Sequence, residues 1–158
     1  MKEFREKQSQ HNLLPPVVLT ADERQGFYVV AATDLPELTL LAEYLGEVRT
    51  DKQTINDPND SIMELLCCKC LDSNEPDPSK SLVVIPQTFS NVGRFFNGIN
   101  NSDKDSKKLK QNVRSMRCQV DAKATVLLYT KRAVKKGEPL VFDYNEAGKN
   151  WYPTHYFV

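Results

Sequence analysis

The sequence predicts a single, mostly β domain built from many short strands. Short segments rich in β-branched and aromatic residues recur along the chain, and turn-forming residues separate them closely. No stretch shows the sustained 3.6-residue periodicity of a long helix. A chain of 158 residues, 40% of them hydrophobic, is also long enough to bury a core without disulfides or a metal to hold it together.

Six segments are expected to form strands, because each combines β-branched or aromatic residues with turn formers at its ends. In chain order they are Phe27 to Ala31, Leu38 to Tyr44, Leu82 to Ile85, Val113 to Val120, Thr125 to Tyr129 and Leu140 to Phe142. Turn-forming clusters separate them, among them Asp34-Leu35-Pro36, Pro76-Asp77-Pro78 and Lys136-Gly137-Glu138-Pro139. A β domain of this kind fixes no function by itself.

Two segments are candidates for helices. Pro58 to Cys70 has mixed periodicity, and Ser90 to Phe96 has room for one or two turns. The stretch from Asn100 to Gln111 holds four lysines and almost no apolar residue, so an exposed loop or a frayed helix is expected there.

The charges exclude some partners and compartments. Lys+Arg is 21 and Asp+Glu is 21, so no global field draws the chain toward nucleic acid or an anionic membrane. The first residues are charged where a signal peptide would be apolar, and no window approaches the roughly 18 apolar residues of a membrane span. An intracellular protein without membrane contact is expected.

The four cysteines, Cys67, Cys68, Cys70 and Cys118, are not placed as the two C-x-x-C pairs of a structural zinc site. In a reducing compartment they are expected to be free thiols, so no metal is expected. Cys67, Cys68 and Cys70 are expected to pack as small apolar side chains, and Cys118 stands apart from them.

Several kinds of enzyme are excluded by missing residues. The two histidines, His11 and His155, lie near the ends of the chain, which leaves few possible bases for a Ser-His-Asp or Cys-His mechanism. The H-E-x-x-H, G-x-x-x-x-G-K-[ST] and G-x-G-x-x-G motifs are absent from the sequence, which argues against a zinc hydrolase, a phosphate-loop NTPase and a Rossmann dehydrogenase.

Four segments stand out because they combine polar and aromatic residues. They are Gln25 to Ala31, Glu43 to Val48, Arg94 to Asn97 followed by Asn112, and Gly137 to Tyr144. In this order they resemble the opening glycine strand and the E-Y-x-G-E-V, R-F-x-N-H-S and G-E-E-L-x-F-D-Y motifs of the SET domain, a family of protein lysine methyltransferases. Arg94 to Asn101, the lysine-rich insert and Tyr152 to His155 also resemble the plant trithorax-related subgroup, which methylates histone three at lysine twenty-seven.

The resemblance implies a SET-domain fold of small sheets of short strands, with little helix and a C-terminal pseudoknot. It divides the chain into an N-terminal lead-in at 1–19, a SET domain at 20–145 and a short tail at 146–158 without a zinc module. It further implies a nuclear chromatin regulator that transfers methyl groups from S-adenosylmethionine to a lysine of the histone-three tail, as a peptide or in the nucleosome.

The resemblance also assigns roles to single residues. Tyr144 is expected to be the catalytic tyrosine, and Tyr44, Phe142 and Tyr144 are expected to wall the channel for the substrate lysine. Cofactor contacts are expected from Gly26, Phe27, Tyr28, Arg94, Phe95, Asn97, Gly98, Tyr144, Trp151 and Tyr152. The tail would fold over the cofactor, with Trp151 or Tyr152 stacked on the adenine.

Elementary chemistry agrees with an aromatic channel. Free lysine has a pKa of about 10.4, so only roughly one amine in a thousand is neutral near pH 7.4. Desolvation between aromatic walls disfavours the ammonium and lowers that pKa, and in-line alignment then replaces a strong base. Because residues two apart on a strand point the same way, Phe142 should face the same channel as Tyr144.

Three assignments have simpler alternatives. Phe142 and Tyr144 would also alternate inward as ordinary core residues. Asn97-Gly98 is also a strong signal for a hairpin turn. The aromatic residues of the tail would also pack on the core as apolar side chains.

Two positions depart from the family's pattern. Gly98 stands where most SET domains have histidine, although a contact made through the backbone would survive this change. Phe142 stands where the plant subgroup has the tyrosine that favours monomethylation, and phenylalanine permits more methyl groups. The missing histidine and zinc module also fit an alternative, a degenerate SET-like module that binds chromatin or a peptide without catalysis.

The lysine-rich insert has two interpretations. Lys104, Lys107, Lys108 and Lys110 would form a solvated loop, which is the usual meaning of such a run. They would also suit a weak contact with the DNA phosphates of a nucleosome.

Overall fold

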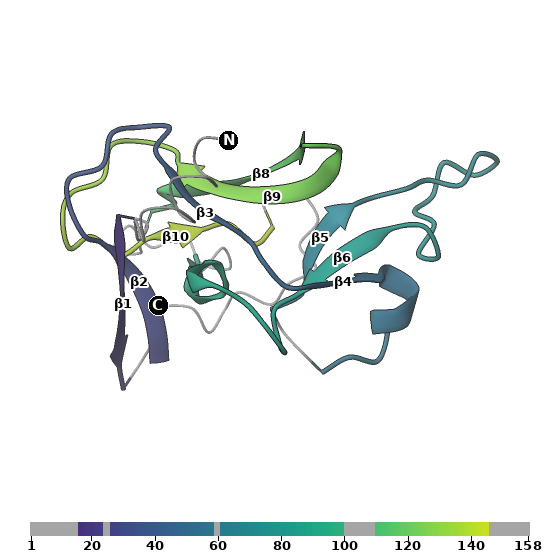
Figure 1. Ribbon diagram of the computed structural model, residues 1–158, viewed down its shortest axis with the longest axis horizontal. Coiled ribbons are helices and arrows are strands. Elements are labelled where there is room, and N and C mark those ends of the chain that lie inside the picture. Colours follow the sequence, from purple (N-terminus) through teal and green to yellow (C-terminus); the bar gives the residue numbers. More distant parts are fainter. Residues whose placement is uncertain (1–15, 24–25, 59–60, 100–109, 146–158) are drawn as a thin grey trace.

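The computed structural model describes residues 16–23, 26–58, 61–99 and 110–145 (Figure 1). Within these ranges, ten short strands form three small sheets, and the helical elements are two 3-10 helices. The strands are β1 (Val17–Asp22), β2 (Gly26–Ala31), β3 (Leu40–Glu43), β4 (Glu47–Thr50), β5 (Met63–Leu66), β6 (Leu82–Ile85), β7 (Asn97–Gly98), β8 (Val113–Val120), β9 (Lys123–Thr130) and β10 (Val141–Phe142). The helices are η1 (Asp51–Thr54) and η2 (Val92–Phe95). The mainly β fold with little helix is confirmed.

All six expected strands are present, as β2, β3, β6, β8, β9 and β10. The short helix expected between Ser90 and Phe96 is also present, as η2. The helix considered for Pro58 to Cys70 is wrong, because its centre forms strand β5, which pairs with β6. Of the stretch from Asn100 to Gln111, only the last two residues lie within the described part of the chain.

Strand β1 was not expected, and it forms a two-stranded antiparallel sheet with β2. Its register runs from Val17 opposite Ala31 to Asp22 opposite Gly26. The boundary at residue 19 between lead-in and SET domain therefore falls inside a strand.

The two larger sheets have the strand orders β4-β6-β5 and β3-β9-β8-β10-β7. In the five-stranded sheet, β8 and β9 form a hairpin closed by Asp121 and Ala122, which both have positive φ, as two-residue hairpin turns require. Between β5 and β6 a long excursion projects away from the three-stranded sheet (Figure 1).

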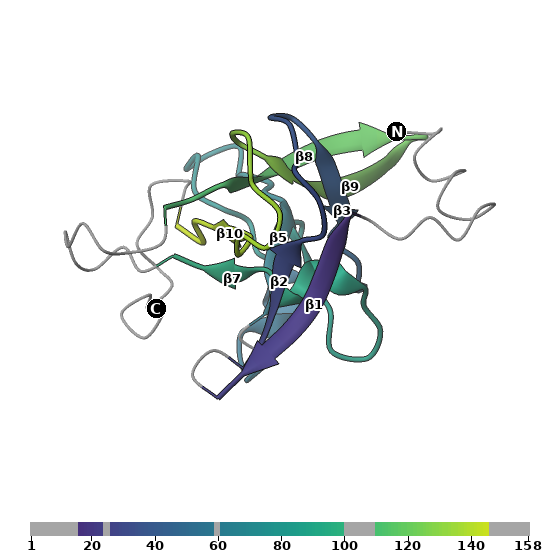
Figure 2. The ribbon, with the colours of Figure 1, turned by 90° about the vertical axis from the view of Figure 1, so that its left-hand side faces the viewer.

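The C-terminal strand β10 lies between β7 and β8 and is parallel to both. Three segments far apart in sequence therefore lie side by side, and Figure 2 shows β10 next to β7. This interleaving is what the expected C-terminal crossing requires, and it brings residues 141–142 beside residues 97–98.

One hydrophobic core joins the three sheets. Val29 of β2, Leu65 of β5 and Leu128 of β9 all belong to the same cluster of buried side chains. Phe96 is among the largest fully buried residues, with 1% of its surface exposed. The segment between η2 and β7 is therefore held by the core.

The segment from Glu43 to Val48, which resembles the E-Y-x-G-E-V motif, depends on its glycine. Gly46 precedes β4, and a Cβ atom at this position would lie 2.4 Å from the carbonyl oxygen of Ile85 in β6. Since such contacts are essentially never observed, only glycine permits this close approach between the two segments.

The four cysteines are free thiols, as expected. Cys67 is exposed, so the expectation that it packs as an apolar side chain is wrong. It lies at the start of the excursion between β5 and β6, outside the core. In the part of the chain that the structure describes, no helix is long and apolar enough to cross a membrane.

Candidate active site

The aromatic pair Phe142 and Tyr144 lies at the end of β10. Their ring centroids are 4.5 Å apart and the rings are tilted by 49°. The two rings therefore lie together, although strand β10 ends at Phe142 and Tyr144 lies in the turn that follows. The Tyr144 hydroxyl donates a hydrogen bond of 2.9 Å to the carbonyl oxygen of Phe96. The phenol is thus tied to the segment that connects η2 to β7.

Tyr44, the third expected wall of the lysine channel, directly follows β3. It is buried, and its ring belongs to the same core cluster as Phe142. Its hydroxyl donates to the carbonyl oxygen of Ser61 over 2.5 Å. The structure therefore fixes Tyr44 as part of the core around the candidate site.

The short helix η2 is fixed by Asn91 at its N-terminus. The Asn91 side-chain oxygen accepts from the Gly93 N–H at 2.9 Å, and the side-chain nitrogen donates to the Glu43 carbonyl at 2.8 Å. Asparagine is a preferred N-cap residue, so this signal was available in the sequence but was not used. The cap joins η2 to the end of β3.

Two of the residues expected to bind cofactor, Arg94 and Phe95, end this helix. The Arg94 guanidinium lies 5.4 Å from the centre of the Phe95 ring and donates to the Pro86 carbonyl at 3.1 Å. The Phe95 ring in turn lies 5.9 Å from that of Phe27, which is 62% exposed. An exposed aromatic ring and a cation therefore lie at one place on the surface.

Strand β2 contributes the remaining residues of this group. Gly26, at its start, has φ of +67° and open space where a side chain would lie. Tyr28, two residues on, is half-buried and pairs with Thr20 of β1. Together, Gly26, Phe27, Arg94 and Phe95 form what is called here the β2–η2 surface.

Asn97 and Gly98 form β7, and they pair in parallel with Val141 and Phe142. The hairpin-turn alternative for Asn97-Gly98 is therefore wrong. The run from Phe95 to Gly98 links the β2–η2 surface directly to the aromatic pair. The structure thus places Asn97 and Gly98, two of the expected cofactor residues, beside the strand that leads to the expected catalytic tyrosine.

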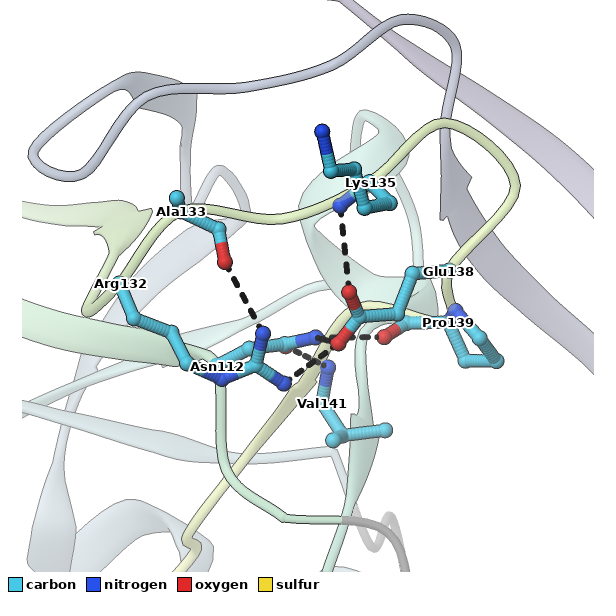
Figure 3. Close-up of polar contacts among 7 residues, drawn as sticks. All are labelled: Asn112, Arg132, Ala133, Lys135, Glu138, Pro139 and Val141. Atoms are coloured by element: carbon cyan, nitrogen blue, oxygen red, sulfur yellow. Dashed lines mark hydrogen bonds and ion pairs between the residues drawn. The ribbon is translucent and has the colours of Figure 1, made fainter.

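A buried polar network stands behind β10 and was missed by sequence reasoning as part of the site (Figure 3). Asn112, which is 1% exposed, donates to the Glu138 carboxylate at 3.0 Å and to the Pro139 carbonyl at 2.8 Å. Its side-chain oxygen accepts from the Val141 N–H at 2.9 Å. The partners of Asn112 are 26 to 29 residues away in sequence, so no local sequence pattern predicts these hydrogen bonds.

The charge of Glu138 is stabilised within this network. Burial alone would raise the pKa of its carboxyl group, but hydrogen bonds from Arg132, Asn112 and the Lys135 N–H outweigh burial. The pKa of Glu138 therefore lies below its usual value of 4.5, and the group is a carboxylate at neutral pH.

Several expected site residues lie outside the described residues. These are Trp151, Tyr152, Lys104, Lys107 and Lys108. Lys110 is described and exposed. Within the described ranges, no group of three or more His, Cys, Asp or Glu side chains could hold a metal ion.

The interleaved sheet and these motif segments define a class of protein. Residues 26–145 match the SET domain family, and the chain belongs to this family. It is 42% identical over 144 residues to the histone-lysine N-methyltransferase ATXR5 of Arabidopsis thaliana, and 37% identical over 145 residues to ATXR6 of the same plant. Each match covers 91% of this chain, which spans 36% and 39% of those two relatives.

The fold is also similar to that of solved structures. A crystal structure of ATXR5 in complex with mono-methylated histone H3.1 superimposes with a TM-score of 0.86 at 37% identity, covering 99% of this chain and 69% of that one. A polycomb repressive complex 2 of Chaetomium thermophilum matches with a TM-score of 0.65 at 19% identity, over 91% of this chain and 16% of that one. The second likeness concerns the fold alone.

Proposed function

We propose that this chain is an S-adenosylmethionine-dependent lysine N-methyltransferase domain that acts on the tail of histone three. The observation that carries the proposal is the Tyr144 hydroxyl, held on the Phe96 carbonyl beside the Phe142 ring and next to the expected cofactor residues. The 42% identity with ATXR5 over most of the chain supports the same activity.

The β2–η2 surface fits a ligand with an aromatic base and a charged amino-acid portion. Phe27 is an exposed ring on which a base can stack, and Arg94 offers a cation to a carboxylate. At Gly26 the backbone is not shielded by a side chain. Phe95, Asn97, Gly98 and Tyr28 are expected to complete the site, and Tyr144 would border it. When bound, S-adenosylmethionine supplies an electrophilic methyl group on sulfur.

The residues around Tyr144 prepare the amine. The Phe142 and Tyr144 rings exclude water, which disfavours the ammonium form of the substrate lysine and lowers its pKa. A phenol that donates to a carbonyl also has oxygen lone pairs with which to orient an amine. In-line positioning then supplies much of the rate enhancement. Tyr44 supports this arrangement from the core.

We further propose lysine twenty-seven of histone three as the target, on the basis of the resemblance to ATXR5 and ATXR6. Monomethylation is favoured by the subgroup, but Phe142 stands where a tyrosine would restrict the product. We therefore propose that the product is not strictly limited to monomethyl lysine. Such an enzyme works in the nucleus.

Nucleosome binding through DNA is a separate part of the proposal. Lys110 is exposed, and Lys104, Lys107 and Lys108 are close to it in sequence. If all four face phosphates, affinity for nucleosomes should fall steeply with salt, and glutamine at these positions should reduce the salt slope. An unchanged slope would leave the lysines as a solvated loop.

The test of the main proposal begins with calorimetric titration of S-adenosylhomocysteine, which binds without turnover. We expect micromolar binding that is lost in Asn97→Ala, followed by methyl transfer to a histone-three tail peptide. A peptide with arginine at position twenty-seven is the control for the target. Cofactor binding without transfer to peptide or nucleosome would favour the degenerate binding module instead.

A further inference from the structure

The side chain of Asn112 forms hydrogen bonds with the segment that leads into β10. It donates to Glu138 and to the Pro139 carbonyl, and it accepts from the Val141 N–H. Its backbone N–H also donates to the Val141 carbonyl at 3.1 Å. Asn112 thus bonds both the N–H and the C=O of Val141. The side-chain nitrogen of Asn112 bonds Glu138 and Pro139, the two residues before Leu140.

Glu138 fixes the Asn112 amide from the other side. Its carboxylate also accepts from Arg132 and, at 3.2 Å, from the Lys135 N–H (Figure 3). Arg132 is itself oriented by a 3.0 Å bond to the Ala133 carbonyl. The carboxylate occupies one of the two donors of the Asn112 nitrogen, and this fixes the amide so that its oxygen faces the Val141 N–H of β10.

Strand β10 is only two residues long, so few ladder hydrogen bonds determine its position. The Val141 N–H, which would otherwise be buried without a partner, depends on the Asn112 oxygen. Val141 lies opposite Asn97, and Tyr144 is three residues further on. Any displacement of β10 would therefore move the Tyr144 hydroxyl relative to the Phe96 carbonyl.

We propose that Asn112, supported by Glu138, is a positioning residue that sets the place of the Tyr144 hydroxyl. The inference rests on the proposed function insofar as Tyr144 is the catalytic tyrosine. Asn112 is 1% exposed, and the hydrogen-bond partners of its side chain are protein groups. It acts through β10, because it holds Val141, which lies opposite Asn97 of β7.

The deciding variant is Asn112→Asp, which keeps the shape and the acceptor for Val141 but replaces the donor with a carboxylate facing Glu138. The readout is the ring resonances of Tyr144 in tyrosine-labelled NMR spectra, assigned by their loss in Tyr144→Phe. The Phe142 ring at 4.5 Å should shift these resonances. We expect this shift to collapse in Asn112→Asp, and kcat to fall by about 100-fold with little change in KM.

Thr130→Val is the matched control. Thr130 is fully buried and makes hydrogen bonds to the Pro36 carbonyl at 2.7 Å and from the Thr39 N–H at 2.8 Å, away from β10. Loss of the Thr130 hydroxyl should lower the free energy of unfolding while leaving the Tyr144 resonances and kcat as in the wild type. A folded Asn112→Asp protein whose Tyr144 resonances match those of the wild type would overturn the inference.

A second pair of variants decides the matter where Asn112→Asp does not fold. Glu138→Gln keeps an acceptor for the Asn112 amide, whereas Glu138→Ala removes it. We expect Gln to preserve the Tyr144 resonances and Ala to shift them, and identical spectra would contradict the positioning role. A wild type that transfers no methyl would refute the proposed function instead, while the spectra still decide the role of Asn112.

Discussion

Tyr144 donates its hydroxyl hydrogen to the carbonyl oxygen of Phe96, 48 residues earlier in the chain, over 2.9 Å. The acceptor belongs to a residue that is almost fully buried, and the donor follows the strand that lies between β7 and β8. The phenol therefore has a defined direction before any ligand arrives. Such preorganisation is what a reaction based on positioning requires.

Replacing Tyr144 with Phe removes this hydroxyl and keeps the ring. We expect methyl transfer to fall by about 100-fold or more, because the amine loses the group that orients it. The free energy of unfolding should fall by only about 1 kcal/mol for one lost hydrogen bond. Peptide methylation and denaturant unfolding, measured on the same preparation, check both parts. Unchanged transfer would remove Tyr144 from the mechanism.

Replacing Phe142 with Tyr tests the control of product. The Phe142 ring faces Tyr144 at 4.5 Å and is buried, so an added hydroxyl would take space beside the amine. We expect products to shift toward monomethyl lysine, as measured by mass spectrometry of the peptide. Phe95→Tyr, on the β2–η2 surface, is a control that should leave the product ratio alone. A ratio that does not respond to Phe142→Tyr contradicts the hypothesis.

Replacing Gly46 with Ala tests the contact between the approach to β4 and the end of β6. The new Cβ would meet the Ile85 carbonyl at 2.4 Å, so the backbone must shift. We expect a loss of about 1–3 kcal/mol in the free energy of unfolding. Leu71→Ala, at a fully exposed position, should change stability little. Equal stability of the two variants would mean that the segments separate at no cost.

The pH dependence of stability should report the Glu138 network. Because the pKa of Glu138 is lowered in the folded protein, its charge contributes stability above the usual value of 4.5. This contribution is lost as pH falls through the lower folded value. The stability advantage of the wild type over Glu138→Gln should therefore be full near neutrality and shrink below pH 4.5. Chemical unfolding across this range measures it, and a constant difference would exclude the linkage.

Local patterns predicted much of the fold. Leu82–Ile85 and Val113–Val120 are strands with the expected ends, because their β-branched residues and flanking turns are local signals. Met63–Leu66 was missed, since its sequence, MELL, has no strand preference and becomes a strand by pairing with β6. Pairing with a distant partner overrides local propensity in such cases.

The candidate site divides in the same way. Alternation along an extended segment predicts that Phe142 and Tyr144 face the same channel. Their rings do lie together, but β10 ends at Phe142 and Tyr144 lies in a turn, so alternation is not what brings them there. The roles of Asn112 and Glu138 could not be predicted, because their hydrogen bonds depend on how β8 and β10 meet in three dimensions. Family resemblance located the motifs, but only the structure showed which contacts hold them in place.

The position of β10 has a consequence for how the protein is made. Since β10 lies between β7 and β8, these two strands do not pair with each other. They can be joined in one sheet only after residues 141–142 have been added. During synthesis the edge of β8 stays open until residues 141–142 leave the ribosome, which favours late, slow closure of the sheet. The segment that carries Tyr144, the proposed catalytic tyrosine, is thus also the one that completes the sheet, so a chain that ends before it would lack both this residue and a closed sheet.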